Sequence, residues 1–351
     1  MRDIAIVGFA QTPSVRRETG LNEVELVMPV VAEAIQRSGI GAKDIGFTCS
    51  GSSDYLAGVP FSFVTTLDAV GAWPPIEESH VEMDGAWALY EAWVRLQHGD
   101  VDSALVYGFG KSSTGNLSEL LSRQLDPYTI GALWPDTISI AALQARAMIE
   151  AGKTSEREMA EVGVRSRRDA LSNPNAQVKG NFDVEAILGQ PYIASPLRKH
   201  DCAPISDGAA AIVLAAGDLA RKVAARPAWI RGIDHRIDSQ NLGARDLTAS
   251  PSARLAAERA GVSKGRIDVA ELCAPFTHQE VLLRDEMELG DGVRINPSGG
   301  ALAAHPMMAA GLIRFGEAAA RIFDGSADRA LAHATSGPCL QQNLVCVLEG
   351  V

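Results

Sequence analysis

The sequence predicts a layered α/β protein made of two related halves. Residues 4–9 and 104–109 are short apolar runs of the kind that form buried strands, and residues 81–97 are apolar on nearly every face, as in a buried helix. The helix, glycine stop and strand of residues 85–105 are repeated in residues 311–331. The positions that match in step include Gly85/Gly311, Glu91/Glu317, Gly99/Gly325, Asp102/Asp328, Ala104/Ala330 and Leu105/Leu331. A repeated unit of helix and strand is typical of an internally duplicated body of sheets and helices.

The first half is expected to begin with the strand at residues 4–9. A helix over residues 23–37 follows and ends at Ser38-Gly39, because glycine readily takes the conformation that terminates a helix. The buried helix over residues 81–97 and the strand over residues 104–109 come next. These elements alternate as a layered α/β fold requires.

The residue composition of the chain changes between residues 111 and 201. Gly, Ser, Pro and charged residues mix there with helical patterns near residues 137–151 and 155–171, so we interpret this stretch as an inserted loop region. A strand over residues 209–215 then closes the first half. The predicted halves are residues 1–221, which include the insertion at about 111–201, and residues 222–351.

Composition limits the kinds of partner. The chain has 351 residues, of which 46% are apolar, enough for a sizeable core. Its net charge of −11 argues against nonspecific binding of nucleic acid, which depends on cations that meet phosphates. A local basic stretch, residues 157–168, has two readings: a site for a phosphate-bearing ligand or a solvated helix face.

The cysteines and the apolar runs indicate the cellular compartment of the protein. Five cysteines are scattered with no CxxC pair, which predicts reduced thiols in the cytoplasm and neither disulfides nor a metal site. No run approaches the roughly 18 apolar residues that a membrane-spanning helix needs, so no membrane span is predicted.

The most specific motif is the stretch Asn296-Pro297-Ser298-Gly299-Gly300, which is followed by His305-Pro306. The glycine pair permits a tight turn, and His305 then stands just before a predicted buried helix. A helix start lowers the pKa of a nearby histidine, and a neutral imidazole can hydrogen-bond a developing oxyanion or act as a base. The other reading of His305 is a capping or core histidine.

This motif resembles the signature of the thiolase superfamily, and more specifically that of its sterol-carrier-protein-x and lipid-transfer-protein branch. Other segments are similar as well: Ser195-Pro196-Leu197-Arg198 to Asp201-Cys202, Ser206-Asp207-Gly208-Ala209-Ala210-Ala211, and Glu271-Leu272-Cys273-Ala274-Pro275-Phe276-Thr277 with Glu280. The resemblance implies a five-layer αβαβα fold with internal duplication, a dimer, and an acyl-coenzyme A thioester bound as substrate with no further cofactor.

The resemblance also implies a nucleophilic cysteine at the start of the first buried helix, and here the sequence departs from the pattern. The Cys-x-x-Gly of the family aligns with Glu82-Met83-Asp84-Gly85, so Glu82 stands where the cysteine is expected. A carboxylate does not readily serve as the nucleophile for acyl transfer from a thioester. Glu82 has two possible roles: a general base if it is desolvated, or a structural acceptor for the free N–H groups of the buried helix that follows it.

Two further departures concern cysteines. The second catalytic cysteine of the family is expected near Ser336 or Gly337, but the chain has Cys339 beyond Pro338. Cys273 stands where the family has a histidine or an asparagine. Both are candidate catalytic residues, and the alternative for each is a buried structural thiol.

Two functions stay open at this point. The chain either acts on an acyl-CoA, including a steroid or other bulky acyl group, as an acyltransferase-like enzyme or a retro-aldol carbon–carbon lyase. Or it is a non-catalytic or half-catalytic subunit that pairs with a second thiolase-like chain or with a partner carrying an OB-fold and a zinc ribbon. A ketoacyl synthase requires the missing cysteine, and a tyrosine-based aldolase is not supported because no tyrosine lies in the C-terminal half.

Overall fold

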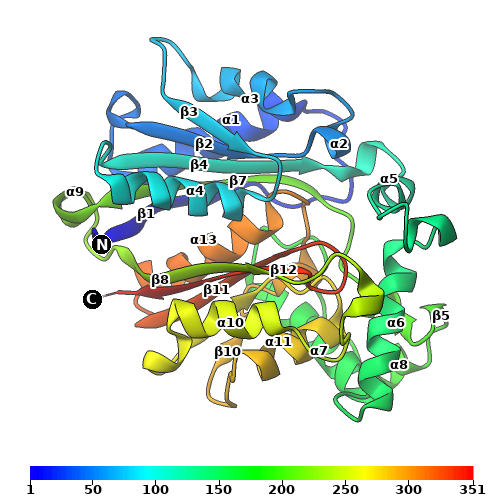
Figure 1. Cartoon of the computed structure of the whole chain (residues 1–351). Helices are drawn as coiled ribbons and strands as arrows, with labels where there is room; N and C mark the ends of the chain where they lie inside the picture. The colour runs from blue at the N-terminus through cyan, green and yellow to red at the C-terminus, as the bar shows by residue number, and fades with distance from the viewer. Residues whose placement is uncertain (351) are drawn as a thin grey trace.

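Two five-stranded sheets form the body of the chain. The computed structural model describes residues 1–350 (Figure 1). The strand order of the first sheet is β3 (Glu78–Val81), β2 (Phe47–Gly51), β4 (Ser103–Lys111), β7 (Asp207–Ala216) and β1 (Ile4–Gln11). The second sheet has the order β8 (Ala228–Ile237), β12 (Gln342–Glu349), β11 (Arg329–Ser336), β9 (Val269–Leu272) and β10 (Arg294–Ile295). β1 and β8 are joined only at Ala5–Trp229 and Ile6–Ala228, so the two sheets meet at one short edge.

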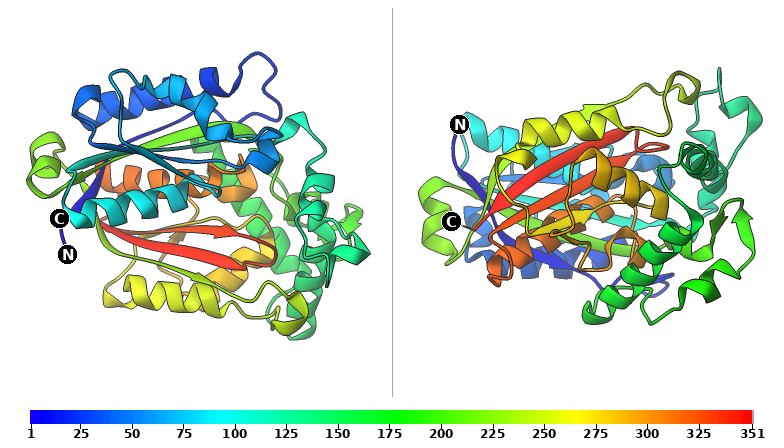
Figure 2. Two further views of the ribbon diagram at one scale, coloured as in Figure 1. Left: turned by 45° about the horizontal axis from the view of Figure 1, so that its top comes forward. Right: turned by 90° about the horizontal axis from the view of Figure 1, so that it is seen from below.

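Helices fill three layers around these sheets. α4 (Gly85–His98) and α13 (Ala310–Phe323) lie between the sheets, as Figure 1 shows. α1 (Glu23–Ser38) and α3 (Ser62–Val70) cover the outer face of the first sheet. α10 (Pro251–Ala260) and α11 (Thr277–Glu286) cover that of the second (Figure 2). The predicted αβαβα arrangement is confirmed, and separate apolar clusters fill the spaces between its layers.

The two sheets repeat each other. Reading outward from the shared edge, the strands are β1, β7, β4, β2, β3 on one side and β8, β12, β11, β9, β10 on the other. In both sheets the second and third of these strands are antiparallel, and the third and fourth are parallel. The matched segments of the sequence are α4 with β4 and α13 with β11, so the duplication seen in the sequence is a duplication of structure.

The first central helix begins later than the sequence predicts. Residues 78–81 form the edge strand β3, and α4 starts at Gly85. The cause is Asp84, whose carboxylate accepts a hydrogen bond from the N–H of Ala86 at 2.9 Å and so caps the helix. An apolar pattern that continues through a buried strand and a buried helix does not reveal this boundary.

The stretch predicted as an insertion forms one end of the molecule, at the right of Figure 1. It contains α5 (Leu117–Arg123), α6 (Thr137–Glu150), α7 (Glu156–Asp169), α8 (Val184–Leu188) and the small hairpin β5 (Tyr192–Ala194) and β6 (Leu197–Arg198). The short helices α2 (Asp54–Ala57) and α12 (Gly300–Ala303) follow β2 and β10. The predicted boundary after residue 221 falls inside α9 (Gly217–Val223), and the division into two halves at that residue stays a prediction.

No helix within residues 1–350 has the length and apolar character needed to cross a membrane.

Candidate functional site

A cavity of about 470 Å³ lies where the two halves meet the inserted region. All four candidate residues from the sequence line it: Glu82, Cys273, His305 and Cys339. Most of its wall is apolar, with Leu, Ile, Met and Phe side chains from α2, α5, α6 and the loops before α11 and α13. Within the described part of the chain, neither Lys nor Arg lines it, so the cavity suits an uncharged, bulky group.

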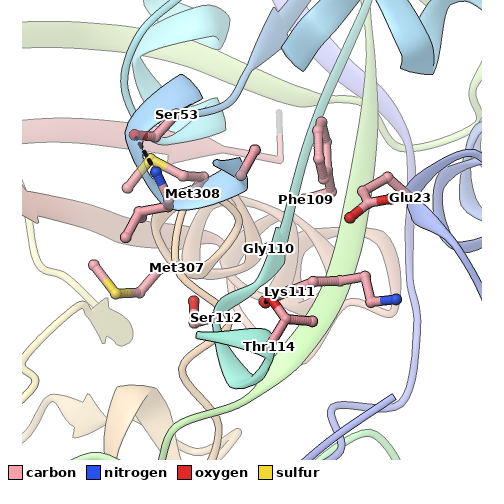
Figure 3. Close-up of a pocket in the computed structure, with 11 residues that line it drawn as sticks. Glu23, Ser53, Phe109, Gly110, Lys111, Ser112, Thr114, Met307 and Met308 are labelled. Atoms are coloured by element: carbon pink, nitrogen blue, oxygen red, sulfur yellow. Dashed lines mark hydrogen bonds between the residues drawn. The ribbon is translucent and has the colours of Figure 1, made fainter. Parts of the chain in front are cut away.

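A much smaller pocket of about 30 Å³ adjoins this cavity (Figure 3). Met307, Met308 and Ser53 line both spaces. Glu23 and Lys111 line its other side, and the Lys111 ammonium donates to the carbonyl of Leu21 at 2.5 Å. Its volume suffices for a water molecule but not for a ligand.

His305 reaches the cavity from the loop that precedes α13. Its backbone N–H donates to Ser206 Oγ at 3.0 Å, and its Nδ1 atom is buried without a hydrogen-bond partner in the described chain. Burial, aided by the nearby Arg314 guanidinium, lowers the pKa of His305 to about 4. The imidazole is therefore neutral at physiological pH, with one N–H to donate and one ring nitrogen that can accept.

The glycine-rich motif holds this loop in place. Gly299 and Gly300 have φ of 93° and 65°, a region that other residues rarely adopt. A Cβ atom on Gly299 would lie 2.7 Å from the Cβ of Ala170, so α7 and its extension pack directly against the turn. The side chain of Asn296 accepts from the N–H of Leu272 at 2.6 Å and donates to Glu280 at 2.7 Å.

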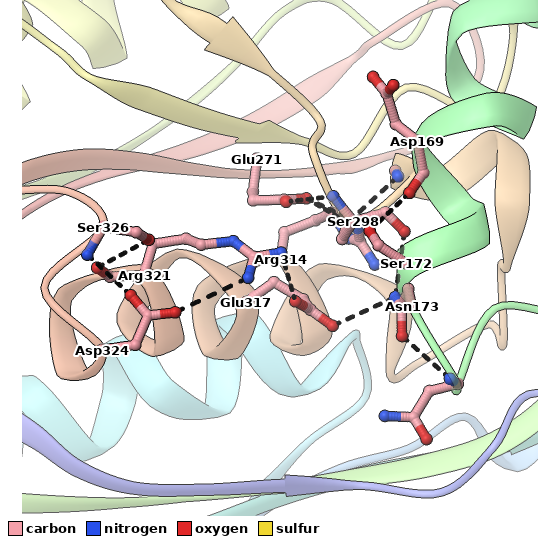
Figure 4. Close-up of polar contacts among 12 residues, drawn as sticks. Asp169, Ser172, Asn173, Glu271, Ser298, Arg314, Glu317, Arg321, Asp324 and Ser326 are labelled. Atoms are coloured by element: carbon pink, nitrogen blue, oxygen red, sulfur yellow. Dashed lines mark hydrogen bonds and ion pairs between the residues drawn. The ribbon is translucent and has the colours of Figure 1, made fainter.

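A buried ion pair anchors the same loop to the core (Figure 4). Arg314 of α13 donates to Glu271 at 2.7 Å and to Ser298 Oγ at 2.6 Å, and the Ser298 hydroxyl donates to Glu271 at 2.7 Å. The three side chains are 2% exposed or less. Two stretches that carry the family resemblance, at residues 271 and 298, thus bond to each other and support His305 without taking part in the cavity.

Glu82 lies at the cavity edge and is exposed. Its Oε1 atom accepts a hydrogen bond from the N–H of Asp54 at 2.7 Å, at the start of α2, while Oε2 has no partner among residues 1–350. Of the two roles considered for Glu82, the acceptor role is thus present, although the helix is α2 and not α4. The condition for the other role, desolvation by the protein alone, is not met in this structure.

Asp84, two residues further on, has a contact pattern that the sequence did not reveal. Its carboxylate accepts from the N–H groups of Ala86, Gly311 and Leu312, each at 2.9 Å, and so caps α4 and α13 together. Burial raises the pKa of Asp84, while the three N–H donors act to lower it. The matched glycines of the internal repeat, Gly85 and Gly311, were the only sequence signal for this junction.

The cysteines that line the cavity are thiols, not thiolates. Burial raises the pKa of Cys273 and of Cys339 to about 12, and a third lining cysteine, Cys202, has the same shift for the same cause. Cys273 is also close to the charge of Asp84, which adds to the increase. The thiol of Cys339 points to the carbonyl oxygen of Ile140 at 3.8 Å. Because the thiolate is the nucleophilic form, none of these groups is activated for attack.

Sequence reasoning missed Gln279, which lines the cavity beside Phe276. Its amide donates to Gln144 Oε1 at 3.0 Å, and the ring of His278 contacts the same oxygen at 3.2 Å. Gln144 in turn donates to the carbonyl of Leu247. The pKa of His278 falls to about 3 through burial, so His278 is a neutral core residue. None of the tyrosines, all of which the structure describes, lines the cavity.

The basic stretch at residues 157–168 is committed to partners inside the chain. Arg157 pairs with Glu185, and Arg168 pairs with Asp169. Arg165 pairs with the buried Glu280, and Arg167 is itself buried and donates to the carbonyl of Leu302. This arrangement favours a structural role for the stretch over a phosphate site.

Comparison with known proteins supports the resemblance. The chain is 27% identical to an acetyl-CoA acetyltransferase of Methanothermobacter thermautotrophicus over 351 residues, which covers 90% of each chain. It is 24% identical to human sterol carrier protein 2 over 273 residues, covering 66% of this chain and half of that protein. These relatives and the fold place the chain among proteins similar to the thiolase superfamily. No protein-family model matches it.

Solved structures show the same fold. A structure described as an Ltp2-ChsH2(DUF35) aldolase superposes with a TM-score of 0.83 at 20% identity, covering 99% of this chain and 98% of that one. Human mitochondrial 3-ketoacyl-CoA thiolase in complex with CoA superposes with a TM-score of 0.78 at 15% identity, covering 100% and 98%. The thiolase-like chain therefore keeps the complete fold, although no cysteine stands at the expected nucleophile position.

Proposed function

We propose that this thiolase-like chain cleaves a carbon–carbon bond in a bulky acyl-CoA by a retro-aldol reaction, without a covalent acyl-enzyme. The observation that carries the proposal is the neutral imidazole of His305, whose Nδ1 lacks a partner in the described chain, in the same apolar cavity as the free oxygen of Glu82. Relatives that act on CoA thioesters, among them an acetyl-CoA acetyltransferase, and the aldolase with the same fold support the substrate class.

In this reaction the β-hydroxyl of the substrate gives its proton to Glu82. The Cα–Cβ bond breaks, the β-carbon leaves as a carbonyl, and the electron pair moves into the thioester as an enolate. His305 donates a hydrogen bond to the thioester oxygen as this charge develops. Glu82 then returns the proton to Cα, which releases a shorter acyl-CoA, so no other reactant is needed. An acyl group that fills the cavity excludes water from the Glu82 oxygen and supplies the desolvation that the empty protein lacks.

The substrate is expected to place its acyl part in the cavity and its phosphates outside. The lining that the structure describes offers no Lys or Arg for phosphates, and its apolar wall suits a steroid or another bulky group. Coenzyme A enters as part of the substrate, and the reaction as written uses no other cofactor.

Replacement of the two proposed residues tests this reaction. Glu82→Gln should lower kcat at least about 100-fold, because proton transfer by a placed side chain contributes that much, and His305→Ala should have a similar effect. Glu78→Gln is the matched control, since Glu78 lies on the neighbouring strand β3 and does not line the cavity. Release of the carbonyl product from a β-hydroxyacyl-CoA is the measurement. Full activity of Glu82→Gln would contradict the mechanism.

A second candidate function is that of a non-catalytic or half-catalytic subunit. It is favoured by the contacts at residues 82 and 84, where carboxylates occupy N–H groups of α2, α4 and α13 that a catalytic centre would otherwise use. The partner would be a second thiolase-like chain or a chain with an OB-fold and zinc ribbon; the alternative is a homodimer. The aldolase with the same fold is described by two component names, Ltp2 and ChsH2, which also supports a complex of two different chains.

The mass of the intact complex, purified through this chain from its host, separates these two functions. A homodimer would leave the chain to supply its own site, and a second polypeptide would favour the subunit function.

We place the protein in the cytoplasm, which accords with five free cysteines.

A further inference from the structure

The carboxylate of Asp84 lies where both central helices of the molecule begin. α4 and α13 have 14 residues each, and their first turns converge on this one side chain. Oδ1 accepts from the N–H groups of Ala86 and Leu312, and Oδ2 accepts from that of Gly311. Free N–H groups at helix starts bind anions, so the donors that surround Asp84 form an anion site whose occupant is part of the chain.

The residues around the Asp84 carboxylate pack closely against it. A Cβ atom on Gly311 would lie 2.6 Å from Oδ1 of Asp84, so a larger residue at position 311 would displace the carboxylate. On α4, Gly85 is packed against Leu312 of α13 in the same way, with 2.9 Å to a would-be Cβ. The two glycines are partners in the internal repeat, and each allows the other helix to approach.

No cation neutralises Asp84 within residues 1–350. The guanidinium of Arg314 is near enough to influence its charge, but its hydrogen bonds go to Glu271 and Ser298. The hydrogen bonds to the Asp84 carboxylate therefore come from backbone N–H groups, as for an anion bound at a helix start. Asp84 is 6% exposed, and it forms part of the cavity wall.

We propose that Asp84 is a specificity-determining residue that fills the anion site at the starts of α4 and α13 and so denies it to any ligand. A carboxylate or oxyanion of a bound molecule cannot bind there, because the three N–H donors are already bonded to Asp84. In the reaction proposed above, on which this consequence rests, the thioester oxygen is therefore bound by His305 and not by the helix starts.

Chemical rescue by formate tests the proposal without any acyl-CoA, so its result does not depend on whether the chain is an enzyme. Asp84→Ala removes the carboxylate, and formate carries the same group without the rest of the side chain. The thermal midpoint of this variant should rise with formate concentration, compared with sodium chloride at equal ionic strength. The wild-type protein should show no such difference.

Asp136→Ala is the matched control. Asp136 lines the same cavity, but its carboxylate caps only α6, through the N–H of Ser139 at 2.7 Å. Formate should not raise the midpoint of this variant beyond the effect of chloride. The proposal is overturned if formate stabilises the wild-type protein in the same way, or if Asp84→Ala gains nothing from it.

If Asp84→Ala does not fold in chloride, the yield of refolding from denaturant gives the answer. Recovery of the native state in formate but not in chloride supports a site for an anion. Failure in both salts, with Asp136→Ala refolding normally, contradicts it.

Discussion

The wall of the cavity that carries His305 and the wall that carries Glu82 are built in different ways. Behind His305, the loop from residue 296 to 300 is bonded on every side, to Glu271, Arg314 and Glu280. Glu82 is exposed, and a single N–H from Asp54 holds it. The stretches that resemble the thiolase family most closely are thus a rigid support. The two residues that we propose to act on the substrate, His305 and Glu82, have side-chain atoms that this support leaves without a hydrogen bond.

The largest expected effect comes from breaking the support behind His305. Arg314→Met removes the only guanidinium that contacts Glu271 in the described chain and leaves that buried carboxylate with the hydrogen bonds from Ser298 but without a cation. The free energy of unfolding should fall by about 3–5 kcal/mol. Arg123→Met is the control, because its pair with Glu119 is exposed to water and should contribute little to stability. Denaturant unfolding of both variants measures the difference; equal losses would contradict a special role for the buried pair.

A smaller loss is expected at the glycine turn. Gly299→Ala should destabilise the protein by about 2–3 kcal/mol, since it combines a left-handed φ with a Cβ contact of 2.7 Å to Ala170. At Gly152, φ is 69° and nothing lies within 4 Å of a would-be Cβ. Gly152→Ala should therefore cost only about 1 kcal/mol. Unfolding curves of the two variants separate the cost of the positive φ, which both share, from the cost of the close contact, which only Gly299 has. A loss of stability at Gly299 no greater than that at Gly152 would show that the packing around Gly299 is loose.

The buried histidine beside Gln144 should make stability depend on pH. The pKa of His278 is about 3 in the folded protein, compared with about 6.5 when unfolded. Below pH 6.5 the unfolded chain takes up a proton that the folded chain does not, so the free energy of unfolding falls as pH falls. This contribution approaches about 1.4 kcal/mol per pH unit and is complete near pH 3.

His278→Leu should reduce the slope of stability against pH between pH 6 and 4.5 by about 1 kcal/mol per unit. His98→Leu, at an exposed position at the end of α4, is the control for the replacement of a histidine by leucine. An unchanged slope in His278→Leu would mean that this histidine takes up its proton in the folded state.

The smallest expected effect is a lack of reaction at the cavity thiols. Because the pKa of Cys273 and of Cys339 is about 12, iodoacetamide at pH 8 should leave both unmodified over the time in which a free model thiol reacts fully. Peptide mass spectrometry gives the answer, and denatured protein serves as the positive control. Rapid alkylation of Cys273 in the native protein would show that its thiol is reactive and would make Cys273 a candidate nucleophile again.

Much of the fold could be predicted from the sequence because its signals are local or repeated. Apolar periodicity located β1, α1 and β4, and the match of residues 85–105 with residues 311–331 predicted the two halves. The family motif placed His305 before α13. The start of α4 was missed, because an apolar run does not distinguish the end of a strand from the start of a helix.

The contacts of the candidate site could not be predicted in the same way. Two of the three N–H groups that bind Asp84 belong to residues 227 and 228 positions away, and the N–H that binds Glu82 comes from a short helix 28 positions before it. Such partners depend on how the layers pack, for which a single sequence holds no direct signal. The burial that makes Cys273 and Cys339 inert as thiols arises from the same packing.

The central claim is carbon–carbon cleavage without a covalent intermediate, and the mass of the chain during turnover tests it most directly. The protein, with any partner that copurifies, is mixed with a β-hydroxyacyl-CoA, quenched at intervals and measured by intact mass spectrometry while product is assayed. We predict that the carbonyl product and a shorter acyl-CoA accumulate while the mass of the chain stays unchanged. An added acyl mass that maps to Glu82 or Cys273 and forms as fast as product would contradict this account.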